Sequence, residues 1–399
     1  MRVLYSFPHP LGRPGIATTA FHQVEGLIEQ GVEVDVVCTS LARDVRGARR
    51  VVETLAVGGR RIPHRALGVH RAYAYHDRRA AQLLERLADE VDVVHTWPAG
   101  CLRTLRTARH LGIPGFREAP SAHTQTAYED AAREAAAVGV ELPPHHHHRY
   151  DADHLRRELE EFEAADYLLV PSAYVERTFL DRGFDGGGLL RHSYGYDPAS
   201  FPSAANDSRS RADGITAVFV GRGEPNKGLH HALRAWIDSG AAERGALLLC
   251  GELLPAYRTR LAPLLSHPSV RELGFVDPVA TVMRDADVLL LPSITEGSAL
   301  VTYEAQAAGC ALLVSTAAGA PCEHGVEALV HEPGDVAALT EHLRMLDRDR
   351  ELLDRMRESA RANAQGLTWS AAGERLAEAY AEGLARQHEP DGRGMVAIG

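Results

Sequence analysis

The sequence predicts an α/β protein with two domains, each built on a parallel β-sheet covered by helices on both faces. Along the chain, short apolar runs alternate with amphipathic segments, a pattern typical of parallel sheets. The alternation stops in a stretch poor in large apolar residues, 201–214, and then starts again. A length of 399 residues with 45% hydrophobic content is enough for two cores of ordinary size.

In the first half of the chain, apolar runs predict strands at 3–7, 32–39, 91–96, 115–118 and 167–171. A loop rich in glycine and proline, 8–15, follows the first of them. A helix over 17–30 is expected next, because apolar residues recur there at helical spacing and Gly31 would end it. Further helices are expected between the later strands.

In the second half, the same reasoning predicts strands at 215–220, 246–250, 270–273, 288–291 and 311–315. Helices are predicted at 229–239, 255–266, 278–285, 298–308, 336–348 and 350–364. In a last helix, 370–387, Leu376, Tyr380 and Leu384 would share one face and pack back on the first domain. We therefore expect an N-terminal domain, 1–205, and a C-terminal domain, 214–369, with a ligand cleft at the carboxyl ends of their strands.

Composition restricts the partners and the compartment. The formal net charge of −11 argues against nucleic acid as a partner. Five widely spaced cysteines without a C-x-x-C pair indicate free thiols in a reducing compartment. No apolar run is long enough for a signal peptide or a membrane span, so we expect a cytoplasmic protein with at most peripheral membrane association. The oligomeric state is not readable from the sequence.

The most informative residue is Lys227, the single lysine among 43 basic residues. It lies in the turn Gly221-Arg222-Gly223-Glu224-Pro225-Asn226-Lys227-Gly228, between a predicted strand and a predicted helix. Glycines allow a backbone to approach a ligand closely, and the following helix offers free N–H groups to an anion. Lysine supplies a compact charge where the fork of arginine would be too wide. The turn, 221–228, therefore predicts a diphosphate site, although its spacing is neither that of a P-loop nor G-x-G-x-x-G.

A second element brings two carboxylates, Glu296 and Glu304, to the loop and helix that follow another strand. Eight helical residues advance roughly 12 Å, so these carboxylates are too far apart to share one proton or one metal ion. They suit two hydroxyl-bearing parts of one long ligand, such as the sugar and the ribose of a nucleoside diphosphate sugar. The amides after Gly297 would approach the diphosphate between them.

Together these motifs resemble the family 4 glycosyltransferases, retaining enzymes of the GT-B fold with two Rossmann-like domains. The G-R-x-x-x-x-K-G turn matches Gly221–Gly228, and the E-x7-E motif matches Glu296 and Glu304. Shorter similarities occur at Gly12 to Gly15, at Gly195-Tyr196-Asp197 and at Thr368-Trp369-Ser370. The resemblance spans nearly the whole chain and is strongest over 215–335.

The resemblance implies a metal-free transfer of a hexose-like sugar from a nucleotide-diphosphate sugar to an acceptor hydroxyl, with retention and with no other cofactor. Arg222 and Lys227 would bind the diphosphate, Glu304 the ribose and Glu296 the sugar. The remaining donor-binding residues implied are Gly12, Gly15, Gly221, Phe275, Val276, Gly297, Ser298, Ala299 and Leu300. Many members have Phe-Gly where this chain has Ser298-Ala299, so the donor sugar stays open, as do the base and the acceptor.

The first half offers fewer signals. The resemblance implies a functional residue after a middle strand, where His123 and Glu118 both qualify; we expect His123 to act near the reacting centre, with Glu118 and Tyr196 on the acceptor side. His95 also ends a strand and fits a structural role better. Four consecutive histidines, 145–148, point in different directions and do not make a tetrahedral metal site unaided, so a flexible acceptor-side loop is the better interpretation.

Other functions stay open at this point. A nucleotide-sugar epimerase, a sugar phosphorylase or a non-catalytic sugar-nucleotide-binding protein would fit the same fold. A metal-dependent transferase would use D-x-D, but Asp151-Ala152-Asp153, Asp285-Ala286-Asp287 and Asp347-Arg348-Asp349 all fall where a metal loop is not expected. Release of free nucleoside diphosphate only in the presence of an acceptor would favour transfer.

Overall fold

The computed structural model describes residues 1–57, 60–62, 68–201 and 214–387. It contains two compact units, and the α/β fold class with two parallel sheets is confirmed. The first unit comprises Met1–Pro120, Asp151–Tyr194 and the chain from Trp369 onward; the second comprises Ser121–Tyr150 and Gly195–Thr368. The 121–150 segment therefore packs with the second unit although it precedes the last strands of the first.

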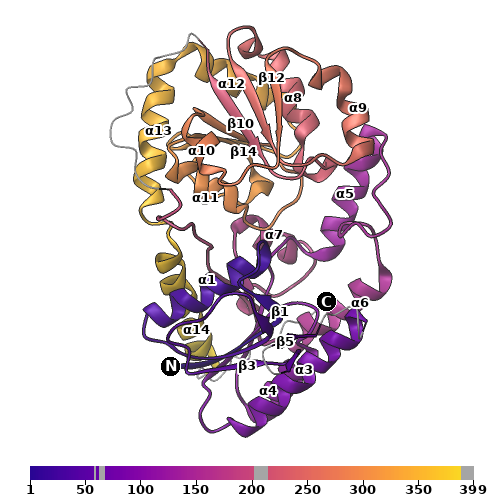
Figure 1. The fold of residues 1–399 in the computed structure, drawn as a ribbon, viewed down its shortest axis with the longest axis vertical. Helices are drawn as coiled ribbons and strands as arrows, with labels where there is room; N and C mark the ends of the chain where they lie inside the picture. Colours follow the sequence, from indigo (N-terminus) through magenta and orange to yellow (C-terminus); the bar gives the residue numbers. More distant parts are fainter. Residues whose placement is uncertain (58–59, 63–67, 202–213, 388–399) are drawn as a thin grey trace. The chain divides into compact units, whose positions relative to one another are not determined.

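The first unit is a seven-stranded sheet in the order β3-β2-β1-β6-β7-β8-β9, with all neighbours parallel. The strands are β1 (Arg2–Leu11), β2 (Glu33–Leu41), β3 (Arg50–Glu53), β6 (Val93–Thr96), β7 (Gly115–Glu118), β8 (Tyr167–Val170) and β9 (Leu189–Arg191). The helices are α1 (Ile16–Glu29), α3 (Val69–Arg86), α4 (Leu102–Leu111), α6 (Ala152–Ala164), α7 (Ala173–Leu180) and α14 (Trp369–Gln387). Helices lie on both faces of this sheet (Figure 1).

Two differences from the sequence prediction concern the strands of this sheet. β1 continues through half of the predicted 8–15 loop, because after a register shift Pro10 and Leu11 pair with Ser40 and Leu41. β3 and β9, which are four and three residues long, were not predicted. Such strands carry too few residues for a periodic signal.

The last helix, α14, packs against α1 within the first unit. Two glycines allow this close approach: a Cβ on Gly26 would lie 2.8 Å from the Trp369 carbonyl oxygen, and one on Gly373 would overlap the backbone of Gly26. Leu376 and Tyr380 on the inner face are fully buried. Helix α14 thus completes the hydrophobic core of the first unit.

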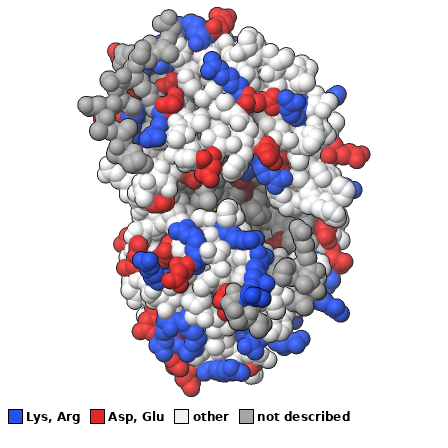
Figure 2. Space-filling model, in the orientation of Figure 1, with Lys and Arg blue, Asp and Glu red and all other residues white. Residues whose placement is uncertain are grey.

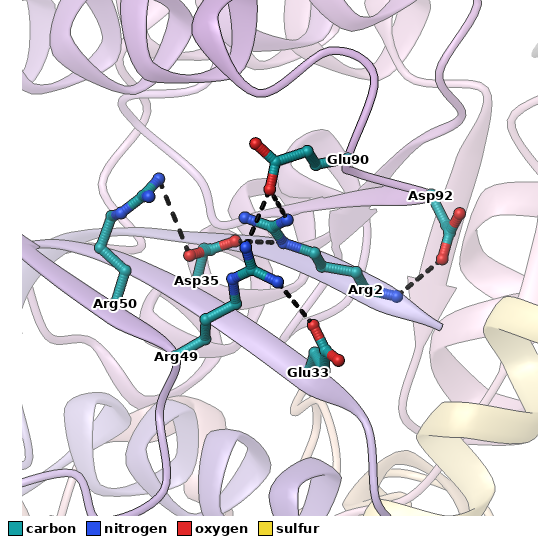
Figure 3. Close-up of polar contacts among 7 residues, drawn as sticks. All are labelled: Arg2, Glu33, Asp35, Arg49, Arg50, Glu90 and Asp92. Atoms are coloured by element: carbon teal, nitrogen blue, oxygen red, sulfur yellow. Dashed lines mark hydrogen bonds and ion pairs between the residues drawn. The ribbon is translucent and has the colours of Figure 1, made fainter.

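An ionic network closes the amino end of the first sheet (Figure 3). Arg2, at the start of β1, donates from Nε to Asp35 of β2 at 2.7 Å and also pairs with Glu90. Its backbone N–H donates to Asp92 at 2.7 Å. The side chains of Arg2 and Asp35 are only 7% and 0% exposed. The network joins the amino ends of the parallel strands β1 and β2 to the residues that precede β6, at the edge opposite to that expected for a ligand.

The second unit is a six-stranded parallel sheet in the order β12-β11-β10-β13-β14-β15. Its strands are β10 (Thr216–Val220), β11 (Ala246–Cys250), β12 (Val270–Gly274), β13 (Val288–Leu291), β14 (Ala311–Ser315) and β15 (Ala328–His331). Its helices are α5 (Thr124–Val138), α8 (Leu229–Asp238), α9 (Pro255–Leu265), α10 (Ala280–Arg284), α11 (Leu300–Ala307), α12 (Val336–Arg348) and α13 (Arg350–Ala364). All of its strands except β15 were predicted from the sequence.

Basic and acidic side chains are interspersed over the face of the molecule in Figure 2, in keeping with the net charge of −11. No helix among the described residues is long and apolar enough to cross a membrane.

Candidate functional site

The two predicted motifs of the second unit lie on neighbouring strands. β10 ends at Val220 and leads into the 221–228 turn, while β13 ends at Leu291 and leads into the loop that carries Glu296. β10 and β13 pair directly and in parallel, so both loops leave the same edge of the sheet. This is the edge where open parallel sheets bind ligands.

The glycines that bound the 221–228 turn have backbone conformations that other residues rarely adopt. Gly221 has φ 149° and Gly228 has φ 69°. A Cβ on Gly228 would overlap the carbonyl oxygen of Pro292. Between them, Pro225–Lys227 form a 3₁₀ turn (η2) that leads directly into α8. The turn is thus packed tightly against the Glu296 loop.

Backbone and side chains join these two loops. The Asn226 carbonyl oxygen accepts a hydrogen bond from Ile294 N–H at 2.7 Å. Lys227 Nζ forms an ion pair with Glu296 Oε1, which also accepts from Ser293 Oγ at 3.3 Å. The side chains of Lys227 and Glu296 are 24% and 14% exposed, so both reach the surface of the site. A ligand anion would meet a cation already fixed in place.

The second basic residue of the turn is more exposed. Arg222 contacts Glu224 through Nε at 3.2 Å, while 59% of its side chain is exposed to solvent. Glu224 itself is 2% exposed. Because the contact uses Nε, the two terminal Nη groups of the guanidinium can bind a ligand. The geometry of these two groups matches that of phosphate oxygens.

Glu304 lies within α11 and is half-buried. Burial raises the pKa of its carboxyl group. Within the described part of the chain, no hydrogen bond or ion pair involves this carboxylate. Buried or half-buried carboxylates are normally paired, so a carboxylate kept without a protein partner suits a ligand that donates hydrogen bonds.

The residues just before α11 make hydrogen bonds within the protein, in addition to any contact with a ligand. Ser298 Oγ donates to the Gly319 carbonyl at 3.0 Å and bonds Tyr303 OH at 2.7 Å. Ala299 N–H donates to the Ala318 carbonyl at 3.0 Å. The Ala299 amide is therefore already hydrogen-bonded within the protein; Leu300, the next residue, begins α11, and Gly297 lies two residues before Ala299.

Phe275 and Val276 follow β12, the outermost strand of the second sheet, which is separated from β10 by β11. Phe275 is 77% exposed, an unusual degree for a large aromatic side chain, and Val276 packs on the core. An exposed aromatic ring at the carboxyl end of a strand offers a surface on which a nucleotide base can stack. Both residues were predicted to lie near the nucleotide base, and that role stays a prediction.

The two glycines predicted from the first unit form its first βα turn. Gly12 and Gly15 have φ values of 83° and 93°. A Cβ on Gly12 would meet Arg43, whereas open space surrounds Gly15, which caps α1. Their conformations explain the glycines, and their donor role stays a prediction.

Glu118 is fully buried at the end of β7, inside a polar network of the first unit. Its carboxylate accepts from Tyr194 OH at 2.8 Å and lies 3.0 Å from His192 Nε2 and 3.5 Å from His95 Nε2. Burial alone would raise the pKa of Glu118, but the histidines and Tyr194 outweigh it and lower the pKa. Burial also lowers the pKa of His95 to about 3, so this histidine is neutral. The arrangement shows a structural function for Glu118 and His95 in the core.

His123 and Tyr196 belong to the second unit. His123 caps α5 by accepting from Gln125 N–H through Nδ1 at 3.3 Å, and its neighbour Ala122 donates its N–H to the Glu296 carbonyl at 3.0 Å. His123 thus lies one residue from a direct backbone contact with the Glu296 loop. Tyr196 is mostly buried and pairs with Thr368 near the end of the unit.

A cavity of about 340 Å³ opens in the first unit beside the loop after β6. Ala99 in this loop has φ 75°, a strained value for a residue with a side chain, and its N–H donates to Glu161 at 3.3 Å. Glu158 and Glu161 also line the cavity, and both pair with buried Arg117. The cavity walls combine apolar surface, including Ala74 and Leu102, with polar groups from His70, Asp77, His154 and Arg157. Sequence reasoning did not find this cavity, because its walls come from segments far apart in the sequence.

The histidine tract, 145–148, is bound to the site instead of forming the expected flexible loop. His146 lies in a turn in which its N–H donates to Pro143 and its carbonyl accepts from Arg149, both at 2.9 Å. Its Nε2 bonds the Glu224 carboxylate, and both side chains are 2% exposed. Burial, together with His147, His146 and Lys227, lowers the pKa of His148 to about 3, so His148 adds no charge here. The prediction of a flexible loop is wrong for His146.

Among the described residues, two groups bring three possible metal ligands together: Glu134, His230 and His231, and His146, His147 and Glu224. In both groups histidine Nε2 atoms already bond the carboxylate. Burial contributes most to lowering the pKa of His147 in the second group, and the positive charges of Arg222 and Lys227 lower it further. The same two charges would repel a metal cation bound there. Asp287 of the D-x-D motif at 285–287 accepts from Thr216 N–H at 2.8 Å and pairs with Arg357. In each of these groups the carboxylate has a protein partner.

Comparisons with known proteins place this site in a family context. Residues 214–349 match the family model for glycosyl transferases group 1. The chain is 30% identical over 180 residues to a D-inositol 3-phosphate glycosyltransferase of Corynebacterium efficiens, covering 41% of this chain and 42% of that protein. A protein of the same name from Corynebacterium aurimucosum is 30% identical over 264 residues, 59% of this chain and 61% of that one. The chain spans about half the length of these relatives.

Solved structures match over almost the full chain. Sucrose-phosphate synthase from Thermosynechococcus elongatus superimposes with a TM-score of 0.69 at 20% identity, over 96% of this chain and 99% of that one. HepE from Anabaena, solved in complex with UDP, gives 0.64 at 17% identity, over 96% and 100%. At these identities the likeness concerns the fold, and it confirms the expected two-domain architecture.

Proposed function

We propose that this chain is a glycosyltransferase, which transfers a sugar from a nucleotide-diphosphate sugar to an acceptor hydroxyl as a retaining, family 4 enzyme. The family-model match over 214–349, the similar relatives and the GT-B architecture support this proposal. The observation that supports this best is the edge shared by β10 and β13. It holds a fixed Lys227–Glu296 pair, an exposed Arg222 and Glu304, whose carboxylate has no partner among the described residues.

In this proposal the donor binds along that edge. Lys227 and Arg222 bind the diphosphate, with the amino end of α8 behind them. Glu304 accepts hydrogen bonds from the ribose hydroxyls and Glu296 contacts the sugar. HepE has been solved with UDP and with UDP-glucose, which makes uridine diphosphate the first nucleotide to test.

The transfer itself requires no protein nucleophile. The bond between the anomeric carbon and the diphosphate breaks while the acceptor oxygen bonds that carbon on the same face. The acceptor proton passes to the leaving diphosphate. Lys227 and Arg222 stabilise the charge that develops on the diphosphate, so positioning and charge stabilisation provide the catalysis without a metal ion.

The acceptor side is assigned to the first unit. The cavity after β6 offers Tyr73 as an apolar wall and Arg157, His154 and Asp77 as polar groups for a hydroxyl-bearing molecule. His123 is the second-unit residue proposed to act near the reacting centre. D-inositol 3-phosphate, named in the relatives, belongs in an acceptor panel beside simple sugars and lipid-linked glycans.

A thermal-shift panel of UDP, GDP, ADP and dTDP tests the donor site, since a ligand that binds only the native state raises the melting temperature. We expect one nucleotide to stabilise the wild type by several degrees and to lose most of this effect in Glu304→Ala. No shift with any of the four nucleotides would contradict the proposal. With the nucleotide known, release of free nucleoside diphosphate only when an acceptor is present would establish transfer.

A further inference from the structure

The 121–150 segment is bonded to the proposed donor site at several points. Ala122 N–H donates to the Glu296 carbonyl, and Glu134 pairs with both His230 and His231 at the start of α8 at 2.6 Å. His146 bonds Glu224 inside the 221–228 turn. The segment therefore contacts both the 221–228 turn and the Glu296 loop, which carry the proposed phosphate-binding and sugar-binding residues of the second unit.

The hydrogen-bond pattern fixes the tautomer of His146. His148 N–H donates to His146 Nδ1 at 3.2 Å, so Nδ1 is the acceptor nitrogen of the ring. The ring proton therefore lies on Nε2 and is donated to Glu224. A metal ion on Nε2 would move the proton to Nδ1, directly against the His148 N–H. The neutral, donating form of His146 is the one that this turn accommodates.

Glu224 is thereby held between two donors. One carboxylate oxygen accepts from His146 and the other contacts Arg222 Nε. A carboxylate that is 2% exposed must have its oxygens satisfied by the protein. With the His146 bond removed, both oxygens would depend on Arg222, and its guanidinium would be drawn away from an incoming phosphate.

We propose that His146 is a positioning residue of the donor site, which acts through Glu224 to keep the Arg222 fork turned toward the diphosphate. This inference rests on the proposed function, because it assigns Arg222 to the diphosphate. It gives the histidine tract a role that is neither metal binding nor a flexible acceptor loop. It also explains why a segment that precedes the last strands of the first unit packs with the second.

The test is calorimetric binding of UDP, or of the nucleotide that the thermal-shift panel selects, to full-length variants. His146→Phe keeps a ring of similar size and removes the donor, and we expect about fivefold weaker binding. His146→Gln places an amide N–H near the position of Nε2 and should bind within twofold of the wild type. His145→Ala, at an exposed position of the same tract, is the matched control and should be unchanged.

A double-mutant cycle separates this role from a general structural effect. In an Arg222→Ala background, His146→Phe should weaken binding less than twofold further, because its target is already absent. Equal losses in both backgrounds, or wild-type affinity in His146→Phe, would overturn the inference. If His146→Phe does not fold, His146→Ala completes the same cycle. Failure of the wild type to bind any of the four nucleotides would instead overturn the proposed function, and the inference with it.

Discussion

The two charged regions of this molecule use similar side chains for opposite purposes. At the amino end of the first sheet, Arg2 pairs with Asp35 and Glu90, and Asp35 is fully buried (Figure 3). At the carboxyl end of the second sheet, Arg222 is 59% exposed and Glu304 has no protein partner among the described residues. In the first region the charges pair with one another inside the protein, although Arg2 Nη2 and Asp35 Oδ1 make no hydrogen bond among the described residues. In the second region charge is left for a ligand to pair with.

This difference is a physical criterion for function. Burying unpaired charge costs stability, so a fold retains it where a ligand makes up the loss. A network whose charges are paired within the protein, even a conspicuous one such as that of Arg2, is expected to act on stability alone. Variants in the two regions should therefore change different measured quantities.

The largest effect is expected from Asp35→Ala. This change removes the buried carboxylate partner of Arg2 and leaves only the more exposed Glu90, and breaking a buried ion pair costs about 3–5 kcal/mol. Thermal unfolding should show a large fall in melting temperature, while nucleotide affinity stays unchanged. The matched control is Glu33→Ala, whose partner Arg49 is 43% exposed and whose loss should cost about 1 kcal/mol or less. Equal costs for the two variants would remove the distinction between buried and exposed members of the network.

Lys227→Ala should have the second-largest effect, on binding instead of stability. It removes the cation nearest to Glu296 and should weaken nucleotide binding at least about tenfold, or about 1.4 kcal/mol. Titration calorimetry measures this directly. Arg258→Ala is the control, because Arg258 forms an exposed pair with Glu272 away from the 221–228 turn. Unchanged nucleotide affinity in Lys227→Ala would contradict the assignment of the 221–228 turn to diphosphate binding.

The sequence predicted the fold and the second-unit loops well because both depend on local signals. Alternating apolar runs fix strands and helices, and glycines with unusual φ values mark the 221–228 turn. Glu296 and Glu304 follow a strand at a spacing set by helical geometry. These features are written in short stretches of sequence, and the structure places them on adjacent strands.

What the sequence did not predict depends on tertiary packing. Nothing in four consecutive histidines indicates that His146 alone is buried against Glu224, because the partner is 78 positions away. Glu118 was considered for acceptor binding, yet it lies in β7 with both faces covered. Here a signal was available: a charged residue in a central parallel strand is buried on both sides and must find partners in the core.

Glu304→Gln is the most specific test of the difference between the two regions, because it should raise the stability of the protein and weaken nucleotide binding. Burial raises the pKa of Glu304 in the folded state above its ordinary value of 4.5, so the folded protein binds this proton more tightly than the unfolded chain does. The ionised carboxylate therefore costs stability at pH values above the folded pKa, and the cost disappears below the ordinary carboxyl pKa. At pH 7 the uncharged glutamine should raise the melting temperature of the ligand-free protein by a few degrees. Near pH 4 the two proteins should melt alike, and nucleotide affinity should fall about tenfold in the variant. A Glu304→Gln protein that is less stable than the wild type at pH 7 would mean that the carboxylate serves the fold, as Asp35 does, and not a ligand.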